Sequence, residues 1–501
     1  MRRLPLLALV LLGFAGCSSG GQNAATDPGT EGAAAPPNAG KATKGTARNW
    51  TRYGFNAQRS NVGPSRVGFR SPAKLRRHRV KLPGIVDSSP IYLHGARVGG
   101  KRRHVFFVTT TYGRTLAIDA ATRKRLWQFV PRGVRSLEGS PQFTNATPIA
   151  DPGRRYIYSV SPNGQIHKLS VRRGREARGW PVTITRDPTH EKIAPALNIN
   201  GRYVIAVTGG YIGDAPPYQG HVAAISRRSG RLAHVFNTLC SDRRTIIKPS
   251  SCRSSASAIW ARAGAVVVPG SRNLIVTTGN APFDGRTDWG DSVLMLSPNG
   301  SRLLQSYTPA THEELAGIDA DLGSTTAALL PAPGGRKPRY AMQGGKDGKV
   351  RLLSLRRLNN KTGRFGPETG GELQVFEPPR GDLAFTTPAV WRTGKRVLVF
   401  TADQGATVAY ELRGSPARLH VLWDNGTSGS SPVLAGGLLY VYDVQGGGLN
   451  VYRPKSGRRV ATLSSGPGHW NSPIVVDGYI ALPEGDANDY DTSGVLNIWS
   501  R

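Results

Sequence analysis

A unit of four short apolar segments recurs along this 501-residue chain, and the repeat restricts the possible folds more than any other feature. A pair of small residues plus Pro opens the first segment, a Gly precedes the third, and a basic turn leads to the fourth. The clearest copy comprises SSPIYL (88–93), HVFFVTT (104–110), GRTLAIDAA (113–121) and RLWQFV (125–130). Apolar runs bounded by Gly, Pro, Asn and Asp are typical of strands and tight turns. The repeat therefore predicts an all-β protein made of four-stranded sheets.

The opening segment occurs eight times along the chain. After residues 88–93 it returns as ATPIA (146–150), IAPALNI (193–199), ASAIWA (256–261), GSTTAALL (323–330), TTPAVW (386–391), SSPVLA (430–435) and NSPIVV (471–476). The last unit ends with its third strand, GVLNIWS (494–500), whereas LRRHRVKL (75–82) is a strand without a unit. Pairing these two strands would close a ring and remove its exposed edges. We expect an eight-bladed β-propeller, with seven blades as the alternative count.

The N-terminus has the pattern of an export signal. Two arginines precede the apolar run Leu4–Phe14, which is too short to span a bilayer, and small residues lead to Cys17. This order resembles the bacterial lipobox, in which the cysteine is lipidated, although Phe14 stands where Leu is usual. Residues 18–48 contain few large apolar side chains and are expected to form a disordered tether rich in Ala, Gly and Pro. We therefore predict a signal peptide at 1–17, lipidation at Cys17 and a propeller over 49–501, with ordinary secretion as the alternative.

The chain is strongly basic, with 66 Lys and Arg against 32 Asp and Glu and a formal net charge of +34. Such an excess favours an anionic partner, and it does not by itself distinguish phospholipid, cell-wall polymer and nucleic acid. Export makes nucleic acid the least expected of the three. The predicted location is extracytoplasmic, with the chain anchored to the cell membrane on the periplasmic side or at the cell surface.

With Cys17 set aside, Cys240 and Cys252 remain as a pair in an exported chain. The expected outcome is a disulfide that closes a short loop. Binding of a metal by the two thiolates is the alternative, which the lack of nearby Cys or His residues at zinc spacing disfavours.

The repeats, with LAIDAATRKRLW as the clearest copy, resemble those of the pyrroloquinoline quinone (PQQ) propeller superfamily, and NWTRYGFNAQRSNVGPS (49–65) resembles its leader segment. That superfamily contains quinoprotein dehydrogenases and cofactor-free relatives such as the lipoprotein of the outer-membrane barrel-assembly machinery. The resemblance covers most of residues 49–501. It implies the fold more strongly than any activity.

The blade order predicts two chemically different faces. The turns between first and second strands and between third and fourth strands share one face, here called the first face, and they are rich in Arg and Lys. The connections on the opposite, second face include the long insertions 209–220, 277–292, 308–323 and 484–494, which are rich in acids, aromatics and glycine. Long loops on a rigid scaffold often carry binding sites. The basic turns either attract an anionic surface or are simply solvated.

Several stretches of the second face resemble the cofactor region of quinoprotein dehydrogenases. The resemblance implies that Trp260 stacks under PQQ, Lys346 contacts its oxygens, and Asn280 binds calcium. It also implies that Asp319, with Asp321 as rival, is the catalytic base, and it leaves Asp214 as the second acidic metal ligand. Each position also has an ordinary structural interpretation, as a core Trp, a turn residue or a capping acid. The acids of residues 486–491 could bind calcium, although a solvated loop is favoured because the EF-hand positions are missing.

The chain departs from the dehydrogenase pattern at important points. The loop 209–220 has Asp214 where the dehydrogenases have Glu, no adjacent-cysteine pair is present, and no Cys-x-x-Cys-His haem motif occurs. The leading hypothesis is therefore a lipid-anchored binding or scaffolding module at the cell envelope. Its expected partners are anionic lipid or wall polymer, with envelope proteins as further candidates. A PQQ- and calcium-dependent alcohol or sugar dehydrogenase is the alternative.

Overall fold

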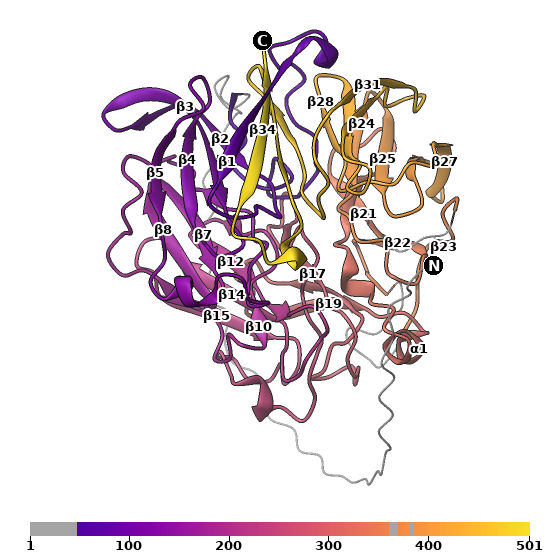
Figure 1. The fold of residues 1–501 in the computed structure, drawn as a ribbon. Helices are drawn as coiled ribbons and strands as arrows, with labels where there is room; N and C mark the ends of the chain where they lie inside the picture. Colours follow the sequence, from indigo (N-terminus) through magenta and orange to yellow (C-terminus); the bar gives the residue numbers. More distant parts are fainter. Residues whose placement is uncertain (1–47, 360–368, 381–383) are drawn as a thin grey trace, which may run out of the picture. The chain divides into compact units, whose positions relative to one another are not determined.

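The computed structural model describes residues 48–359, 369–380 and 384–501. The predicted signal peptide, Cys17 and almost all of the tether lie outside these residues. The described chain forms eight four-stranded antiparallel sheets arranged as the blades of a propeller (Figure 1). The predicted fold class and blade count are therefore confirmed.

Blades one to four follow one another along the chain. Blade one contains β2 (Ile91–Val98), β3 (Lys101–Thr109), β4 (Thr115–Asp119) and β5 (Arg125–Phe129), and blade two contains β6 (Ile149–Ala150), β7 (Tyr156–Ser161), β8 (Gln165–Ser170) and β9 (Val182–Thr183). Blade three contains β11 (Asn198–Asn200), β12 (Tyr203–Val207), β14 (His221–Ser226) and β15 (Leu232–Asn237). Blade four contains β16 (Val266–Val267), β17 (Leu274–Thr277), β18 (Val293–Leu296) and β19 (Leu303–Tyr307). A separate two-stranded ladder pairs β10 (Glu191–Lys192) with β13 (Gly209–Gly210).

Blades five to eight complete the ring. Blade five contains β20 (Ala328–Pro331), β21 (Pro338–Gln343), β22 (Val350–Ser354) and β23 (Gln374–Phe376), and blade six contains β24 (Ala389–Thr393), β25 (Arg396–Ala402), β26 (Thr407–Arg413) and β27 (Arg418–Asp424). Blade seven contains β28 (Val433–Ala435), β29 (Leu438–Tyr442), β30 (Leu449–Tyr452) and β31 (Arg459–Leu463). Blade eight contains β32 (Ile474–Val476), β33 (Tyr479–Glu484), β34 (Gly494–Ser500) and β1 (Arg76–Leu82).

The ring closes through the predicted pairing of the first strand with the last. β1 runs antiparallel to β34, with Arg76 opposite Ser500 and Leu82 opposite Gly494, and the indigo and yellow strands lie side by side in Figure 1. Neighbouring blades also pack through aromatic side chains. Phe106 of blade one meets Tyr479 of blade eight edge to face, with ring centres 5.8 Å apart.

The small residues that open each repeat connect the blades near the axis. Only short side chains fit where the inner strands converge, and their hydroxyls reach the next blade. Such hydrogen bonds run from Ser89 Oγ to Ser472 O (3.1 Å), Ser430 Oγ to Asn471 O (2.6 Å), Thr325 Oγ1 to Thr386 O (2.7 Å) and Thr144 Oγ1 to Ile193 O (2.6 Å). The small-residue motif therefore precedes the strand proper, and most inner strands begin a few residues later than predicted.

The opening strand of blade four was predicted wrongly. Residues 256–261 are not a strand; the inner strand is β16, at Val266–Val267. Ala256 and Ser257 have positive φ angles, and the Ser257 N–H donates to Asn280 O (2.8 Å) in a neighbouring connection. Backbone groups used in this way cannot join a strand ladder.

Short helical segments occupy some connections. The insertion at 308–323 contains α1 (His312–Gly317), which the strand pattern did not predict, and the remaining helical turns are 3₁₀: η2 (Pro72–Lys74), η3 (Val134–Leu137), η4 (Pro249–Ser251), η5 (Leu322–Ser324) and η6 (Ala487–Asp489). Within the described ranges, none of the helices has the length and apolar character needed to cross a bilayer.

The leader segment crosses the inner strands of the ring. Its backbone exchanges hydrogen bonds with β2, β16, β24 and β28, and Val67 O accepts from the N–H of Gly478 in the β32–β33 turn. Arg59 is only 2 % exposed, and its guanidinium donates to the carbonyls of Tyr53, Ala196, Leu197 and Ala263. The leader thus ties separate blades together close to the first face.

Candidate functional site

The connections of blades four and five bring the predicted cofactor residues together on the second face. Asn280 lies in the β17–β18 connection, Asp319 and Asp321 lie between β19 and β20, and Lys346 lies in the β21–β22 turn. Lys346 Nζ is 2.6 Å from Asp321 Oδ2, 3.2 Å from Asp319 Oδ2 and 5.5 Å from the centre of the Trp260 ring. These positions were predicted only by resemblance, and they do form one cluster.

Asn280 is held by both carboxylates. Its backbone N–H donates to Asp321 Oδ1 (2.8 Å), and its Nδ2 donates to Asp319 Oδ1 (3.1 Å). The remaining atom, Asn280 Oδ1, is buried and has no hydrogen-bond partner among the described residues. A buried amide oxygen without a donor is a suitable ligand for a hard cation.

Lys346 is charged in this arrangement. Burial alone would lower its pKa, but Asp321 and Asp319 outweigh burial, so the pKa of Lys346 lies above its ordinary value. The ammonium therefore offsets one of the two negative charges and lies between the carboxylates that would serve as base and metal ligand. As it stands, the set holds a lysine cation between these acids, and it does not fit a calcium ion at the same place.

Asp214 lies at the edge of this cluster. Tyr218 Oη donates to Asp214 Oδ1 (3.1 Å) in a partly buried contact. Desolvation together with the carboxylate of Asp321 raises the pKa of Asp214. Asp214, Asp319 and Asp321 do not bring three metal-ligand atoms close together. Among the described residues, two other groups do so: His94 with His104 and Asp477, and Asp87 with His469 and Asp486.

A row of aromatic rings continues from Trp260 across the second face. The ring centre of Trp260 is 6.1 Å from that of Phe385, and Phe385 is 5.2 Å from Trp470. Both partners come from connections that lead into later blades. The rings form a polarizable surface that suits a planar ligand, although sequence reasoning identified only Trp260.

A second charged cluster, centred on Asp87, was missed. Asp87 is buried and accepts from Asn145 Nδ2 (2.7 Å), Arg262 Nη2 (3.3 Å) and His469 Nδ1 (2.8 Å). Burial would raise the pKa of Asp87, but Arg262 and His469 outweigh it and hold the pKa below its ordinary range. These residues come from four separate connections, and only the folded ring places them in contact.

Lys192 is another missed residue of the second face. Its side chain is buried, with Nζ 4.4 Å from the ring centre of Phe143 and 5.4 Å from that of Tyr211. Burial and the nearby Arg262 lower the pKa of Lys192 to about 7. No local motif distinguishes this lysine, because its environment is made by distant segments.

The acids of residues 277–292 mostly organise the loop itself. Asp284 Oδ1 accepts from the N–H groups of Arg286, Thr287 and Asp288 at 2.8 to 2.9 Å. Asp291 Oδ1 accepts from the N–H of Leu322 (3.0 Å). In the loop 484–494, Asp486 likewise caps η6 by accepting from Asn488 N (2.9 Å). These acids serve as turn and capping groups, and Asp486 also lies 3.4 Å from His469 Nδ1 of the Asp87 cluster.

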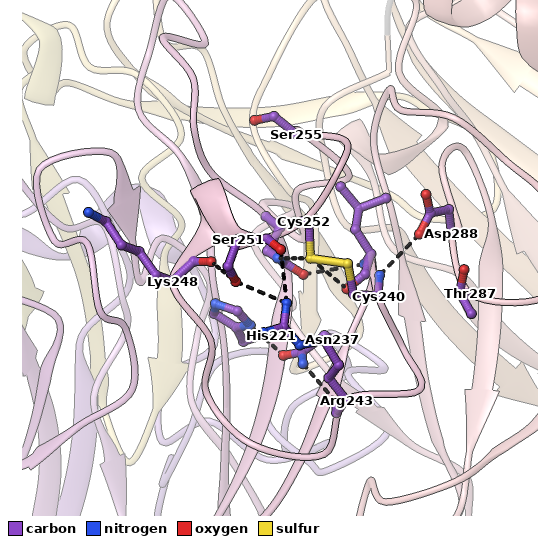
Figure 2. The surroundings of a disulfide bond; sticks show 12 residues. His221, Asn237, Cys240, Arg243, Lys248, Ser251, Cys252, Ser255, Thr287 and Asp288 are labelled. Atoms are coloured by element: carbon purple, nitrogen blue, oxygen red, sulfur yellow. Dashed lines mark hydrogen bonds between the residues drawn. A yellow bond between two sulfur atoms is a disulfide. The ribbon is translucent and has the colours of Figure 1, made fainter. Parts of the chain in front are cut away.

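The predicted disulfide is present between Cys240 and Cys252, whose Cα atoms are 6.1 Å apart. Figure 2 shows Asp288 directed toward the Cys240 backbone, where Oδ1 accepts from the N–H (3.0 Å). Arg243 Nη1 donates to Ser251 O (3.0 Å) across the closed loop. The disulfide is therefore a local clamp beside the base of the 277–292 loop.

The first face has the predicted basic character. Its turns contain acids at Asp119, Asp151, Glu176, Glu372 and Asp477, and within the part of the chain that the structure describes none of them is exposed. Exposed cations are present in the turns of all blades except the last, including Lys124, Arg154, Arg155, Arg172, Arg173, Arg175, Arg202, Arg228, Arg231, Arg272, Arg302, Arg336, Lys337, Arg356, Arg357, Lys395, Arg453, Lys455 and Arg458.

Comparisons with known proteins agree with the fold. Residues 76–268 match a family model described as outer membrane protein assembly factor BamB. No curated protein sequence matches the chain.

Solved structures give the same result over most of the chain. A europium-containing methanol dehydrogenase has a TM-score of 0.65 at 14 % identity, covering 91 % of this chain and 98 % of that one. A quinohemoprotein alcohol dehydrogenase from Comamonas testosteroni has a TM-score of 0.63 at 14 % identity, covering 92 % and 81 %. BamB from Moraxella catarrhalis has a TM-score of 0.51 at 14 % identity, covering 85 % and 100 %. The chain thus has the eight-bladed propeller fold that quinoprotein dehydrogenases and BamB share.

Proposed function

We propose that this chain is an exported, lipid-anchored propeller that acts as a binding or scaffolding module at the cell envelope. The observation that carries the proposal is the first face, where exposed Arg and Lys gather in the turns and no described acid is exposed. An N-terminus of the lipoprotein type would hold this face near anionic phospholipid or wall polymer. Each well-placed cation then contributes about 1 kcal/mol of attraction to an anionic membrane.

The comparisons support an envelope role by analogy. The matching family model is described as an outer membrane protein assembly factor. In the second-face cluster around Lys346, this lysine already pairs with Asp319 and Asp321. Acids that are paired with a lysine of the same site can serve structural cohesion or ligand binding.

The basic face can be tested apart from the anchor. The unlipidated Cys17→Ser protein is mixed with anionic phospholipid vesicles, zwitterionic vesicles or isolated cell-wall polymer at low and high ionic strength, and sedimentation is measured. The proposal expects binding to anionic vesicles that is lost at high salt, since surface charges are screened. Absence of binding to anionic vesicles and to wall polymer at both ionic strengths would remove the basic-face proposal.

A PQQ- and calcium-dependent dehydrogenase is the second candidate function. It is favoured by the convergence of Trp260, Asn280, Asp319 and Lys346, and by the unpartnered Asn280 Oδ1. The test is reconstitution with PQQ and calcium. Quinone absorbance that stays with the purified protein, together with dye reduction by an alcohol or a sugar, would establish this activity, and the absence of both would eliminate it.

A further inference from the structure

Two histidines and an aspartate meet on the first face, at the seam where the ring closes. His94 lies on β2 and His104 on β3 of blade one, and Asp477 lies in the β32–β33 turn of blade eight. His94 Nδ1 is 2.5 Å from Asp477 Oδ2, and His104 Nδ1 is 4.0 Å from the same oxygen. The two imidazole rings are 4.3 Å apart between centres. None of these residues belongs to the cluster around Lys346.

We propose that His94, His104 and Asp477 form a binding site for a divalent transition metal, with zinc as the best match. Two imidazoles and one carboxylate are a common donor set for zinc, which binds His nitrogen at about 2.0 to 2.1 Å and carboxylate oxygen at about 2.0 to 2.2 Å. Tetrahedral ligands at these lengths lie about 3.4 Å from one another. To reach this spacing, the 2.5 Å distance from His94 Nδ1 to Asp477 Oδ2 must lengthen and the 4.0 Å distance from His104 Nδ1 to the same oxygen must shorten. Both changes are smaller than about 1 Å and can be made by rotation of the side chains.

The hydrogen bonds set the protonation and orientation of the ligand atoms. His104 Nδ1 accepts from the Gly95 N–H at 3.3 Å, so this nitrogen is unprotonated, and a metal must replace this long hydrogen bond to reach its lone pair. The Tyr92 hydroxyl donates to Asp477 Oδ2 (2.6 Å), and the His94 backbone N–H donates to Asn49 Oδ1 (2.8 Å). These contacts orient the carboxylate and fix the backbone beside the first imidazole.

The site is open to solvent and has room for a further ligand. The side chains of His94, His104 and Asp477 are 29 %, 40 % and 18 % exposed. The nearest competing cation is Arg48, whose Nε is 3.9 Å from Asp477 Oδ1 and whose Nη1 is 3.3 Å from His94 Nε2. Arg48 is 65 % exposed and can swing away when a metal enters.

A metal here would bridge the two blades that close the ring. Because two ligands come from blade one and the third from blade eight, binding stabilises the folded ring in proportion to metal concentration. The prediction is a rise in Tm on addition of zinc, and this rise does not depend on any activity of the second face.

The test uses untagged protein, freed of metal and titrated with Co²⁺ while visible absorption is recorded. We expect one Co²⁺ per chain with the d–d bands of a four- or five-coordinate ion, displaced by Zn²⁺. His104→Ala and Asp477→Asn are expected to weaken binding at least tenfold; the Asn variant keeps a residue type that tolerates the φ of +52° at this turn. Arg48→Ala is expected to tighten binding, and the exposed His420→Ala is the matched control.

The outcomes separate the proposed site from general surface binding. Loss of the cobalt bands in His104→Ala and Asp477→Asn, with retention in His420→Ala, supports the site. If the wild-type protein gives no such bands, or if all variants give the wild-type titration, the proposal is overturned. The Arg48 variant keeps the test decisive even if a ligand variant folds poorly, because Arg48 is an exposed residue whose removal leaves the three ligands in place.

Discussion

Lys346 Nζ lies 2.6 Å from Asp321 Oδ2 and also contacts Asp319 Oδ2. The ammonium thus bridges two acids of the β19–β20 connection. This ion pair decides how the second face should be interpreted. With the ammonium in place, one of the two negative charges is offset, and Asn280 Oδ1 is a buried oxygen left without a donor among the described residues. Without it, the same oxygens would form an anionic pocket.

Lys346→Ala is therefore expected to create a calcium site. Asp321 is only 5 % exposed, so removal of its counter-charge should destabilise the protein by about 3 to 5 kcal/mol at neutral pH, and added calcium should restore part of this loss. Terbium luminescence sensitised by Trp260 measures the gain in cation binding. Lys349→Ala, in the same turn, is the control, and equal terbium binding by both variants would contradict the interpretation.

Asp291→Asn should stabilise the protein at alkaline pH. Burial and the carboxylates of Asp321 and Asp347 raise the pKa of Asp291 to about 8. The unfolded chain ionises this group at its ordinary value, so the wild type loses stability as pH rises toward 8, by about 1.4 kcal/mol per pH unit. Between pH 6 and pH 8 the Asn variant should gain roughly 2 to 3 kcal/mol relative to the wild type.

Urea unfolding at both pH values measures the difference between the two proteins. Asp291 has a φ of +43°, which Asn tolerates, and the Asn carbonyl can still accept from Leu322. The exposed Asp242→Asn is the control. A pH-independent difference between the Asp291 variant and the wild type would show that this carboxyl is ionised in the folded protein.

Arg59→Met should weaken the whole ring. The guanidinium donates to four buried carbonyls of the leader and of the connections into blades three and four. Met fills similar volume but leaves these acceptors unsatisfied, so a loss of about 3 kcal/mol or more is expected in chemical unfolding. The exposed Arg66→Met, immediately after the leader, should change the free energy of unfolding by less than about 0.5 kcal/mol. Equal effects of the two substitutions would argue against the leader as a tie between blades.

Removal of the disulfide should have a moderate effect. Cys240 and Cys252 are 12 residues apart, and a loop of this size corresponds to about 3 kcal/mol in the chain-entropy model. The Cys240→Ser, Cys252→Ser double variant should remain folded and lose that amount in urea unfolding. The same loss of unfolding free energy in the wild-type protein after reduction would agree with a contribution from the disulfide. No loss in the reduced wild type or in the double variant would contradict it.

The architecture could be predicted because its cause is local and repeated. Alternating apolar segments such as TLAIDA specify strands, and the unpaired strands at the two ends of the repeats specify the closure of β1 on β34. The start of blade four was wrong because Ala256 and Ser257 look like the small pairs of other blades. Their positive φ angles and loop contacts arise only in the folded ring.

The site was predictable only where a motif resembled a known one. Trp260, Asn280, Asp319 and Lys346 lie in recognisable stretches and do converge. Three other features carry no local sequence signal, because each depends on residues from separate blades. They are the Asp87 cluster, the buried Lys192, and the group of His94, His104 and Asp477. The pairing of Lys346 with Asp319 and Asp321 likewise arises only when the chain folds and brings these residues together.

The most direct measurement compares the two faces with matched variants. One variant carries Arg172→Ser, Arg173→Ser and Arg228→Ser in first-face turns; the other carries Arg186→Ser, Arg253→Ser and Arg286→Ser in second-face connections. All six residues are exposed, and both variants lower the net charge equally. In the unlipidated protein, binding to anionic vesicles at low ionic strength should fall at least tenfold in the first variant and stay near the wild-type value in the second. Equal binding by the two variants would contradict the claim that the first face is the envelope-binding surface.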